Sequence, residues 1–466
     1  MNTARISAFD SLFLLGESRQ IMMHVAGMMI FELPEGASPD YLRQLGQRMK
    51  DSAALFPPWN RRPTMPDALW NPRNRWKEEA DVDMDYHVRR LALPAPGDER
   101  ELGVLISRLH SNPLDFSRPL WEVYVIEGLE RNRFAIYTKV HHALMDGYTA
   151  VRSMSRALAS TPEEPARPFF FSEPPERRPT PNYPAIKFNI GRMSKAPVEQ
   201  VQSTYHAASA LARFWQRDRS EANKDLVSSW EAPMTILNQR IGRNRRYATQ
   251  QIALADAKAL AKKNGGTLND VVIALCAGGL RRYLMEFGDL PEKPLVAMVP
   301  VNIRPKDDPG GGNAVGTILV SMATHLEDPA ERLRAIIASS RAAKAQLEGM
   351  STSAIMQYSS LLMAPFGAQA ALAYMGVRAP IPLAFNLIIS NVRGSNEPQY
   401  LDGARVEAVY PVSIPTHGTA LNITVQSHVE SLNFGFVGCR DTVPSLQKLA
   451  VFTGQEMRAL QQAPVS

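Results

Sequence analysis

Two adjacent histidines and an aspartate form the strongest chemical signal in the sequence. Residues 141–147 read HHALMDG and directly follow a strand-like run that ends at Val140. Successive side chains of a strand point to opposite faces, so we expect only one of the two imidazoles to face a cavity. That imidazole could take a proton from a hydroxyl or a thiol, because its pKa lies near neutrality. The structural alternative is a pair of packed histidines at a strand end. A shared metal ion is disfavoured, because metal ligands must converge on one point.

The segments around these histidines predict the elements that position them. Residues 121–129 (WEVYVIEGL) and 133–140 (RFAIYTKV) alternate and are rich in β-branched and aromatic residues, which predicts a hairpin. Helical spacing of apolar residues predicts further helices in this part of the chain. The other predicted elements are a strand over 20–33 and helices over 39–51, with Ser38 as its N-cap, 98–110 and 148–159.

A proline-rich segment divides the chain. Residues 161–200 contain nine prolines, and proline lacks the backbone donor that helix and sheet interiors need, so we expect an extended linker. Strand-like and helical runs alternate on both sides of it, which favours a mixed α/β protein with two lobes. After the linker we predict helices over 199–220, 256–263, 268–287, 328–375 and 444–460, and strands over 247–254, 295–303, 315–326, 385–392, 404–412, 420–429 and 432–439.

Composition excludes several classes of protein. Apolar residues make up 45% and charged residues 21% of the 466 residues, which excludes wholesale disorder. The two cysteines, Cys276 and Cys439, exclude a disulfide scaffold or a multi-cysteine metal site. Both lie in apolar runs, so we expect them in the core. The first ten residues show no apolar signal region. The longest uncharged stretch, 349–377, is too polar and too interrupted to span a membrane, and we interpret it as core helix or as the wall of an apolar tunnel.

The net charge of +6 is concentrated in two runs without acidic residues, 177–195 and 240–246. Such runs fit a solvated face, an anionic membrane surface or a phosphorylated ligand. Nucleic acid is disfavoured, because no basic helix is interleaved with aromatic residues and no finger, RNP-type or KH-type motif is present.

Several further motifs accompany the histidines. The triplet Pro119, Leu120 and Trp121 precedes them, and the chain opens with ISAFDSLFL at 6–14. The rest are Asn269-Asp270, Ser390-Asn391-Val392, YPVS at 410–413 and GTALNI at 418–423. Together they resemble the bacterial wax ester synthase/acyl-CoA:diacylglycerol acyltransferases, a branch of the superfamily that includes chloramphenicol acetyltransferase and peptide-synthetase condensation domains. The chain departs from the family at 393–395, where Arg-Gly-Ser replaces the usual Pro-Gly-Pro, and at His428, where tyrosine is common.

The resemblance implies a fold and a reaction. It implies two chloramphenicol acetyltransferase-like lobes with the active site in a channel between them. We place the lobes at 1–160, which carries HHxxxDG, and 201–466. His142 would act as general base on the hydroxyl of a fatty alcohol or diacylglycerol as it attacks an acyl-CoA thioester, giving wax esters or triacylglycerol. The CoA thiol, with a pKa near 8.5, is a tolerable leaving group. A serine nucleophile is disfavoured because no G-x-S-x-G motif occurs.

The resemblance also implies roles for the other motif residues. His141 and Asp146 would support the base, with Asp146 facing away from substrate and Arg304 as its partner. Asn269, Asp270 and Asn391 are candidates for binding substrate or the oxyanion, although Asn269 could equally be an ordinary helix-start residue. Structural support is expected from Gly147, Pro119, Leu120 and Trp121. Acyl-CoA would be a substrate, and neither a cofactor nor a metal is implied.

The apolar products imply contact with a membrane or lipid droplet. We therefore expect a cytoplasmic protein attached peripherally to the inner face of the membrane or to lipid inclusions. Arg243, Arg245 and Arg246 would contribute to that contact, with the CoA phosphates as the competing ligand. Two other functions stay open: a condensation-type domain that uses carrier-bound acyl groups, and a non-catalytic droplet protein. Chain-length preference and oligomeric state stay open as well.

Overall fold

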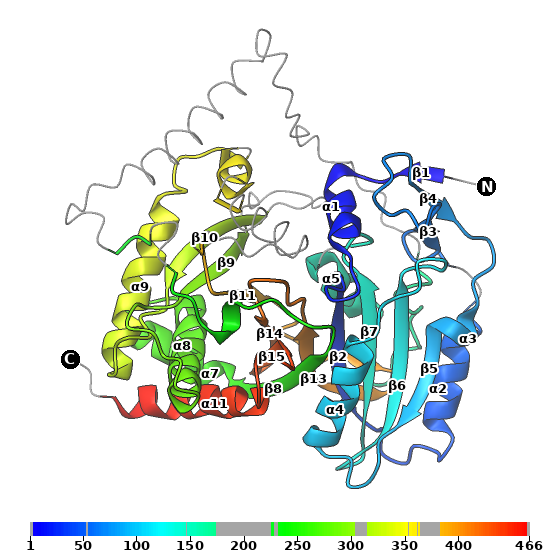
Figure 1. The fold of residues 1–466 in the computed structure, drawn as a ribbon. Coiled ribbons are helices and arrows are strands. Elements are labelled where there is room, and N and C mark those ends of the chain that lie inside the picture. Colours follow the sequence, from blue (N-terminus) through cyan, green and yellow to red (C-terminus); the bar gives the residue numbers. More distant parts are fainter. Residues whose placement is uncertain are drawn as a thin grey trace.

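The computed structural model describes residues 3–52, 55–145, 147–173, 225–227, 232–302, 315–352, 354–360, 362–363 and 383–463. Within these residues, two six-stranded sheets lie in two lobes side by side, and a small three-stranded sheet caps one of them (Figure 1). The predicted mixed α/β architecture with two lobes is confirmed.

The first sheet carries the histidines. Its strand order is β12 (Tyr400–Leu401), β13 (Ala404–Val412), β2 (His24–Glu32), β7 (Arg133–His141), β6 (Trp121–Leu129) and β5 (Val88–Ala92). The predicted hairpin is the pair β6–β7. Helices α2 (Tyr41–Lys50) and α5 (Gly147–Arg156) pack on one face, and α4 (Glu99–His110) packs on the other. Successive side chains of β2 and β7 point to opposite faces of the sheet, so each strand contributes to the apolar cluster on both faces. Met29 and Ile136 face α2 and α5, whereas Met28 and Tyr137 face α4.

The C-terminal half contributes two strands to this first sheet. β13 pairs antiparallel with β2 over most of its length, and β12 pairs with β13. The chain therefore crosses from the second lobe to the first before β13 and returns after it (Figure 1). Within the first sheet, β13 lies beside β2, which pairs with β7, the strand that ends at His141.

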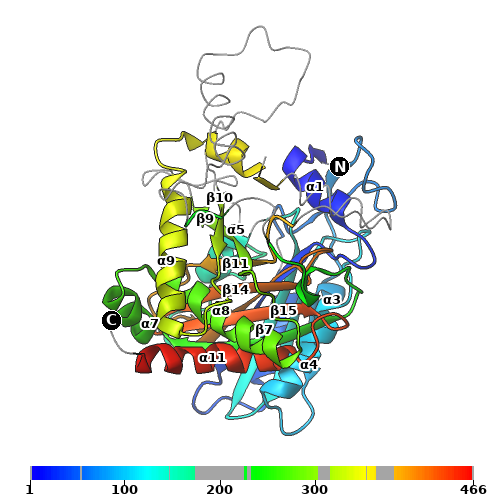
Figure 2. The ribbon, with the colours of Figure 1, turned by 60° about the vertical axis from the view of Figure 1, so that its left-hand side comes forward.

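The second sheet has the order β10 (Val315–Ser321), β9 (Val296–Asn302), β11 (Leu387–Val392), β14 (Leu421–His428), β15 (Ser431–Cys439) and β8 (Arg245–Ala253). Four helices cover it: α7 (Leu254–Lys263), α8 (Leu268–Glu286), α9 (Pro329–Ala345) and α11 (Leu446–Gln462) (Figure 2). The largest apolar cluster of the described chain lies between this sheet and its helices. It contains Cys276 and Cys439, so the prediction that both cysteines are core residues is confirmed.

Several predicted boundaries are wrong. Asp40, not Ser38, precedes α2, and its side chain makes no capping hydrogen bond. The strand predicted from residue 20 begins at His24, because residues 18–21 form a turn that the Ser18 hydroxyl holds through two backbone N–H groups. Some short elements were not predicted: α1 (Ala8–Gly16), β1 (Thr3–Arg5), β3 (Arg61–Pro63), β4 (Arg75–Glu78), α3 (Met84–His87), β5, β12 and the 3-10 turn Ile236–Asn238.

The first part of the proline-rich segment packs on the first lobe rather than extending from it. Phe170 and Phe171 are buried, and the Phe171 ring stacks on Trp121 with ring centroids 5.1 Å apart. Aromatic burial at this point outweighs the preference of proline for extended chain. The helix predicted over 199–220 and the later part of 328–375 lie outside the described residues. Across the described residues, none of the helices combines the length and the apolar character that membrane crossing requires.

Four buried histidines should make the fold sensitive to acid. Burial lowers the pKa of His24 well below its usual value, that of His110 to about 3, and those of His87 and His417 to about 4. In the unfolded chain each ring takes up a proton near pH 6.5, so the free energy of unfolding should fall as the pH drops from about 6.5 toward 4. We expect the urea midpoint to be clearly lower at pH 5 than at pH 7.5. A midpoint that stays constant over this range would contradict this reading of the histidines.

Candidate active site

The two adjacent histidines occupy different surroundings, as expected. The ring of His141 is 1% exposed and lies edge-on to Phe116, with ring centroids 5.4 Å apart. Its Nδ1 accepts a hydrogen bond from the Ala143 N–H at 3.1 Å, and its Nε2 lies 3.4 Å from Glu17 Oε2. A neutral ring that accepts at Nδ1 carries its hydrogen on Nε2. Nδ1 of His141 is therefore hydrogen-bonded, whereas Nε2 lies within ion-pair distance of Glu17 without a hydrogen bond.

The ring of His142 lies against helix α1 and is partly exposed. It stacks on Phe13 with ring centroids 4.0 Å apart and planes 12° apart. The His142 N–H donates to the Met23 carbonyl at 2.8 Å, which ties the residue to the chain just before β2. Of the two imidazoles, His142 is therefore the more exposed.

The Pro119-Leu120-Trp121 triplet supports the backbone of the histidines. The Leu120 carbonyl accepts a hydrogen bond from the His141 N–H at 2.9 Å, and the Leu120 side chain shares an apolar cluster with Leu14 and Ala143. Trp121 is fully buried, and its Nε1–H donates to the Trp59 carbonyl at 2.7 Å. The contacts of the triplet are thus packing and backbone contacts, and its role as structural support stays a prediction.

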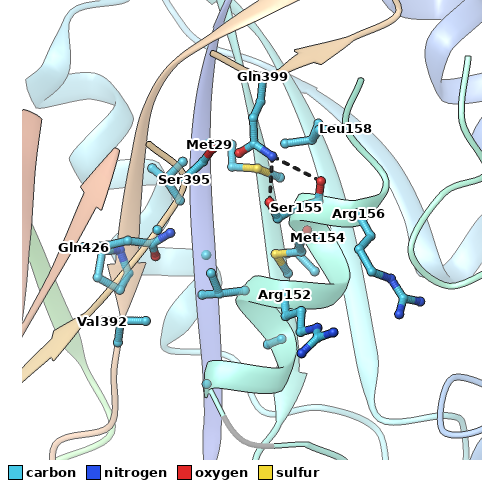
Figure 3. Close-up of a pocket in the computed structure, with 18 of the residues that line it drawn as sticks. Met29, Arg152, Met154, Ser155, Arg156, Leu158, Val392, Ser395, Gln399 and Gln426 are labelled. Carbon is cyan, nitrogen blue, oxygen red and sulfur yellow. Dashed lines mark hydrogen bonds between the residues drawn. The ribbon is translucent and has the colours of Figure 1, made fainter. Parts of the chain in front are cut away.

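A cavity of about 490 Å³ lies between the lobes, beside helix α5. Figure 3 shows Met154 and Ser155 of α5 on one side and Val392 and Gln426 of the second sheet on the other. Gln399 joins the two sides, since its Nε2 donates to Ser155 Oγ at 2.6 Å and to the Ser155 carbonyl at 3.1 Å (Figure 3). The volume and the mixed lining suit one small-molecule substrate or part of a larger one.

The chain departs from the family that it resembles at residues 393–395 and at His428. Residues 393–395 lie at this cavity, and Gly394 contacts Ser427, the residue before His428. Arg393, Gly394 and Ser395 line the cavity. A Cβ on Gly394 would lie 2.1 Å from the Ser427 carbonyl oxygen, so only glycine fits, and its N–H donates to Ser427 Oγ at 3.2 Å. His428 is buried, its Nε2 lies 3.3 Å from the Val406 carbonyl, and burial lowers its pKa.

The structure brings only some of the predicted site residues to the cavity. Gly147 lines it, at the start of α5. Asp270 instead forms a capping box with Thr267 at the start of α8, where it receives hydrogen bonds from the Thr267 N–H and hydroxyl at 2.8 Å. Asn269 lies beside it on the same turn, and Asn391 pairs with Val425 in the second sheet. Neither asparagine is among the described residues that line the cavity.

Two predicted partners lie outside the described residues. Asp146 and Arg304 are both in this position, so their pairing stays a prediction. The expectation that Arg245 binds a membrane or CoA is wrong. Arg245 is 3% exposed and donates hydrogen bonds to the carbonyls of Gly242 and Gln20, so its guanidinium joins β8 to the chain that precedes β2. Arg243 is exposed and Arg246 partly so.

Three residues at the site were not predicted from the sequence. Phe13 contacts the histidines from α1, and Glu17 and Met23 contact them from the segment between α1 and β2. The sequence around Glu17 also contains Asp10, Arg19 and Gln20, so nothing in it singled out this carboxylate as the partner of a histidine.

The chain matches two family models. Residues 6–272 match the wax ester synthase/diacylglycerol acyltransferase catalytic domain, and residues 311–461 match the WS/DGAT C-terminal domain. A putative diacylglycerol O-acyltransferase of Mycobacterium tuberculosis is 46% identical, over 98% of this chain and 97% of the relative. The O-acyltransferase WSD of Acinetobacter baylyi is 38% identical, over 96% of this chain and 95% of the relative.

Solved structures show the same relationship. The wax ester synthase/diacylglycerol acyltransferase from Marinobacter aquaeolei VT8 is 35% identical and superposes with a TM-score of 0.79, covering 98% of each chain. The first condensation domain of the calcium-dependent antibiotic synthetase has a TM-score of 0.56 at 16% identity, over 98% of this chain and 95% of that domain. At that identity the second likeness concerns the fold alone.

Proposed function

Because the chain belongs to the wax ester synthase/diacylglycerol acyltransferase family and is an acyltransferase, we propose that it transfers a fatty acyl group from acyl-CoA to the hydroxyl of diacylglycerol or of a long-chain alcohol. The observation that carries this proposal is the division between the two histidines. His141 is enclosed by protein, whereas His142 is partly exposed. His142 is not among the described residues that line the inter-lobe cavity, although Val140 before it and Gly147 after it are.

His142 acts in this proposal as the general base. It takes the proton from the acceptor hydroxyl while the oxygen attacks the thioester carbonyl. The tetrahedral intermediate then collapses, the carbon–sulfur bond breaks, and the proton on His142 passes to the CoA sulfur. The products are one ester and one free CoA thiol, and no acyl group is attached to the protein. Asp146 and Arg304 support the histidine segment as a pair.

An acceptor screen tests the reaction. Labelled palmitoyl-CoA is incubated with the protein and either hexadecanol or dioleoylglycerol, free thiol is measured, and the lipids are separated by thin-layer chromatography. We expect thiol release that depends on the acceptor and equals the ester formed. Thiol release without ester, or ester formed only from a phosphopantetheinyl carrier, would contradict the proposal. The ratio of wax ester to triacylglycerol follows from the same plates.

We further propose that the enzyme works in the cytoplasm, attached peripherally to the inner face of the membrane or to lipid inclusions. The support comes from three exposed apolar side chains of the first lobe, here called the apolar patch: Leu12 and Leu15 of α1, which are 62% and 53% exposed, and Trp70, which is 71% exposed. Leu12 and Leu15 are one turn apart and share a face of the helix. Leu14 and Leu69, the sequence neighbours of Leu15 and Trp70, pack in one apolar cluster beneath them.

Basic residues flank this patch. Arg5 and Arg75 are both exposed and are paired directly across strands β1 and β4. Exposed leucine and tryptophan beside arginine suit an anionic lipid surface, where each arginine contributes about 1 kcal/mol. Since Phe13 of the same helix stacks on His142, a lipid held at α1 lies close to the proposed base.

Replacement of Leu12 and Leu15 by serine should weaken binding to vesicles of phosphatidylcholine and phosphatidylglycerol by at least about tenfold, because two partly buried leucines contribute more than about 1.4 kcal/mol. Flotation of vesicles measures this binding, and added salt should weaken it further. Met285→Ser is the control, because Met285 is 54% exposed on α8 of the other lobe. Equal binding by the double variant and the control would rule out the patch.

A further inference from the structure

Glu17 connects helix α1 to both histidines. It directly follows α1 as its C-cap residue, and its side chain is 8% exposed. Its Oε2 accepts a hydrogen bond from the Met23 N–H at 2.6 Å and lies 3.4 Å from His141 Nε2. This carboxylate oxygen therefore accepts one hydrogen bond, from the backbone before β2, and lies within ion-pair distance of the His141 ring without a hydrogen bond to it.

These two contacts lead to the reacting side chain by separate routes. The peptide carbonyl of Met23 accepts the His142 N–H at 2.8 Å, so Glu17 fixes one residue that holds the backbone of His142. The ring of His141 accepts the Ala143 N–H at its Nδ1, so Glu17 also fixes the residues on both sides of His142. In addition, α1 carries Phe13, whose ring stacks on His142.

We propose that Glu17 is a positioning residue for acyl transfer. Its Oε2 holds the Met23 peptide by a hydrogen bond, and its negative charge beside Nε2 favours the Nε2–H form of His141 that the Ala143 N–H selects at Nδ1; together these place His142 against Phe13. The inference rests on the proposed role of His142 as base. Glu17 itself touches neither the substrate nor the reacting atoms.

The charge of Glu17 offers a competing role. Glu17 lies close enough to Lys139 and Arg245 to favour their charged forms, although burial lowers the pKa of both groups. Because Oε2 accepts the Met23 N–H, glutamine can keep that hydrogen bond through its carbonyl, and can keep the contact with the Nε2 side of His141, while it loses the charge. Leucine keeps the approximate volume but accepts from neither donor. The two substitutions therefore separate hydrogen bonding from charge.

The experiment compares Glu17→Gln and Glu17→Leu with Glu35→Leu, a control that removes one exposed acidic residue from the first lobe. We measure kcat and the acyl-CoA KM at saturating acceptor. A displacement of about 1 Å costs up to about 10²-fold in rate, so we expect Glu17→Leu to lower kcat by at least about tenfold with KM within about twofold. Glu17→Gln should keep at least about a third of the wild-type kcat.

Two kinetic outcomes would overturn the inference: a Glu17→Leu kcat within about twofold of wild type, or a glutamine variant as impaired as the leucine variant. If Glu17→Leu fails to fold, a second measurement that does not need this variant still tests the inference. In ¹⁵N-histidine-labelled wild type and Glu17→Gln, the His141 ring should give the signals of the neutral Nε2–H form, and an Nδ1–H form would overturn the inference. A wild-type protein that transfers no acyl group refutes the proposed function, whereas the ring spectrum still tests the contacts of Glu17.

Discussion

His142→Ala should lower kcat for acyl transfer by about 10²–10⁴-fold and leave the fold intact. The expected size is that of general-base catalysis by one positioned side chain. The fold should survive because the ring is partly exposed and its main backbone bond, from the His142 N–H to the Met23 carbonyl, does not depend on the side chain. Single-turnover rates with radiolabelled acyl-CoA, together with the circular dichroism spectrum and thermal midpoint, measure both parts.

His141→Ala is the matched control for this prediction. It removes a ring that is fully enclosed and contacts Glu17, Ala143 and Phe116. We expect a smaller loss of kcat than for His142→Ala, together with a lower thermal midpoint. If His142→Ala keeps a third of the wild-type kcat, His142 is not the base. If His141→Ala is the more damaging of the two in a folded protein, the roles are reversed.

Glu122→Leu should destabilise the protein by about 3–5 kcal/mol. Glu122 and Lys139 are 5% and 0% exposed at their side chains, and Lys139 Nζ lies 2.7 Å from Glu122 Oε2. Removal of the carboxylate leaves a buried ammonium without its counter-charge, and that uncompensated charge is the main cost. Urea unfolding, with the midpoint and slope reported separately, measures the loss.

The double variant Glu122→Leu, Lys139→Met tests whether the unpaired ammonium of Lys139 causes the loss of stability in Glu122→Leu. The double variant should recover much of the stability lost in Glu122→Leu, because replacement of a whole buried pair by apolar residues is often nearly neutral. A double variant as unstable as the single one would assign the loss to packing or to the Tyr86 and Tyr124 hydroxyls that also contact Glu122. Burial would raise the pKa of Glu122, but Lys139 and the hydrogen bonds bring it below its usual 4.5, so the contribution of the pair is complete above about pH 5 and is lost as the pH falls further.

The long, alternating elements could be predicted from the sequence because their periodicity is strong. The β6–β7 hairpin and helix α4 agree with prediction to within one residue at each end. The strands β1 and β3 have three residues each, too few for an alternating pattern to appear. β5 pairs in parallel with β6, and its sequence, VRRLA, carries two arginines that mask its apolar face.

The site could be predicted only as far as its linear motif. Residues 141–147 and the triplet before them are contiguous, so spacing alone indicates their chemistry. Glu17 meets His141 only because the chain turns back at β2, and no local pattern records that contact. For Arg245 the error was a predicted ligand contact that the structure does not support. A count of charges does not reveal that this guanidinium is buried and donates its hydrogen bonds to backbone carbonyls.

The pairing of β13 with β2 also constrains how the protein is made. A ribosome releases β2, β7 and β6 long before residues 404–412 exist, so one edge of β2 has no partner for most of synthesis. An unpaired, apolar strand edge is a template for association with other chains. Because this contact joins distant parts of the sequence, closure of the first sheet is a late event that follows emergence of the second lobe. The two halves therefore mature together, and the nascent first half depends on protection of its open edge until β13 arrives.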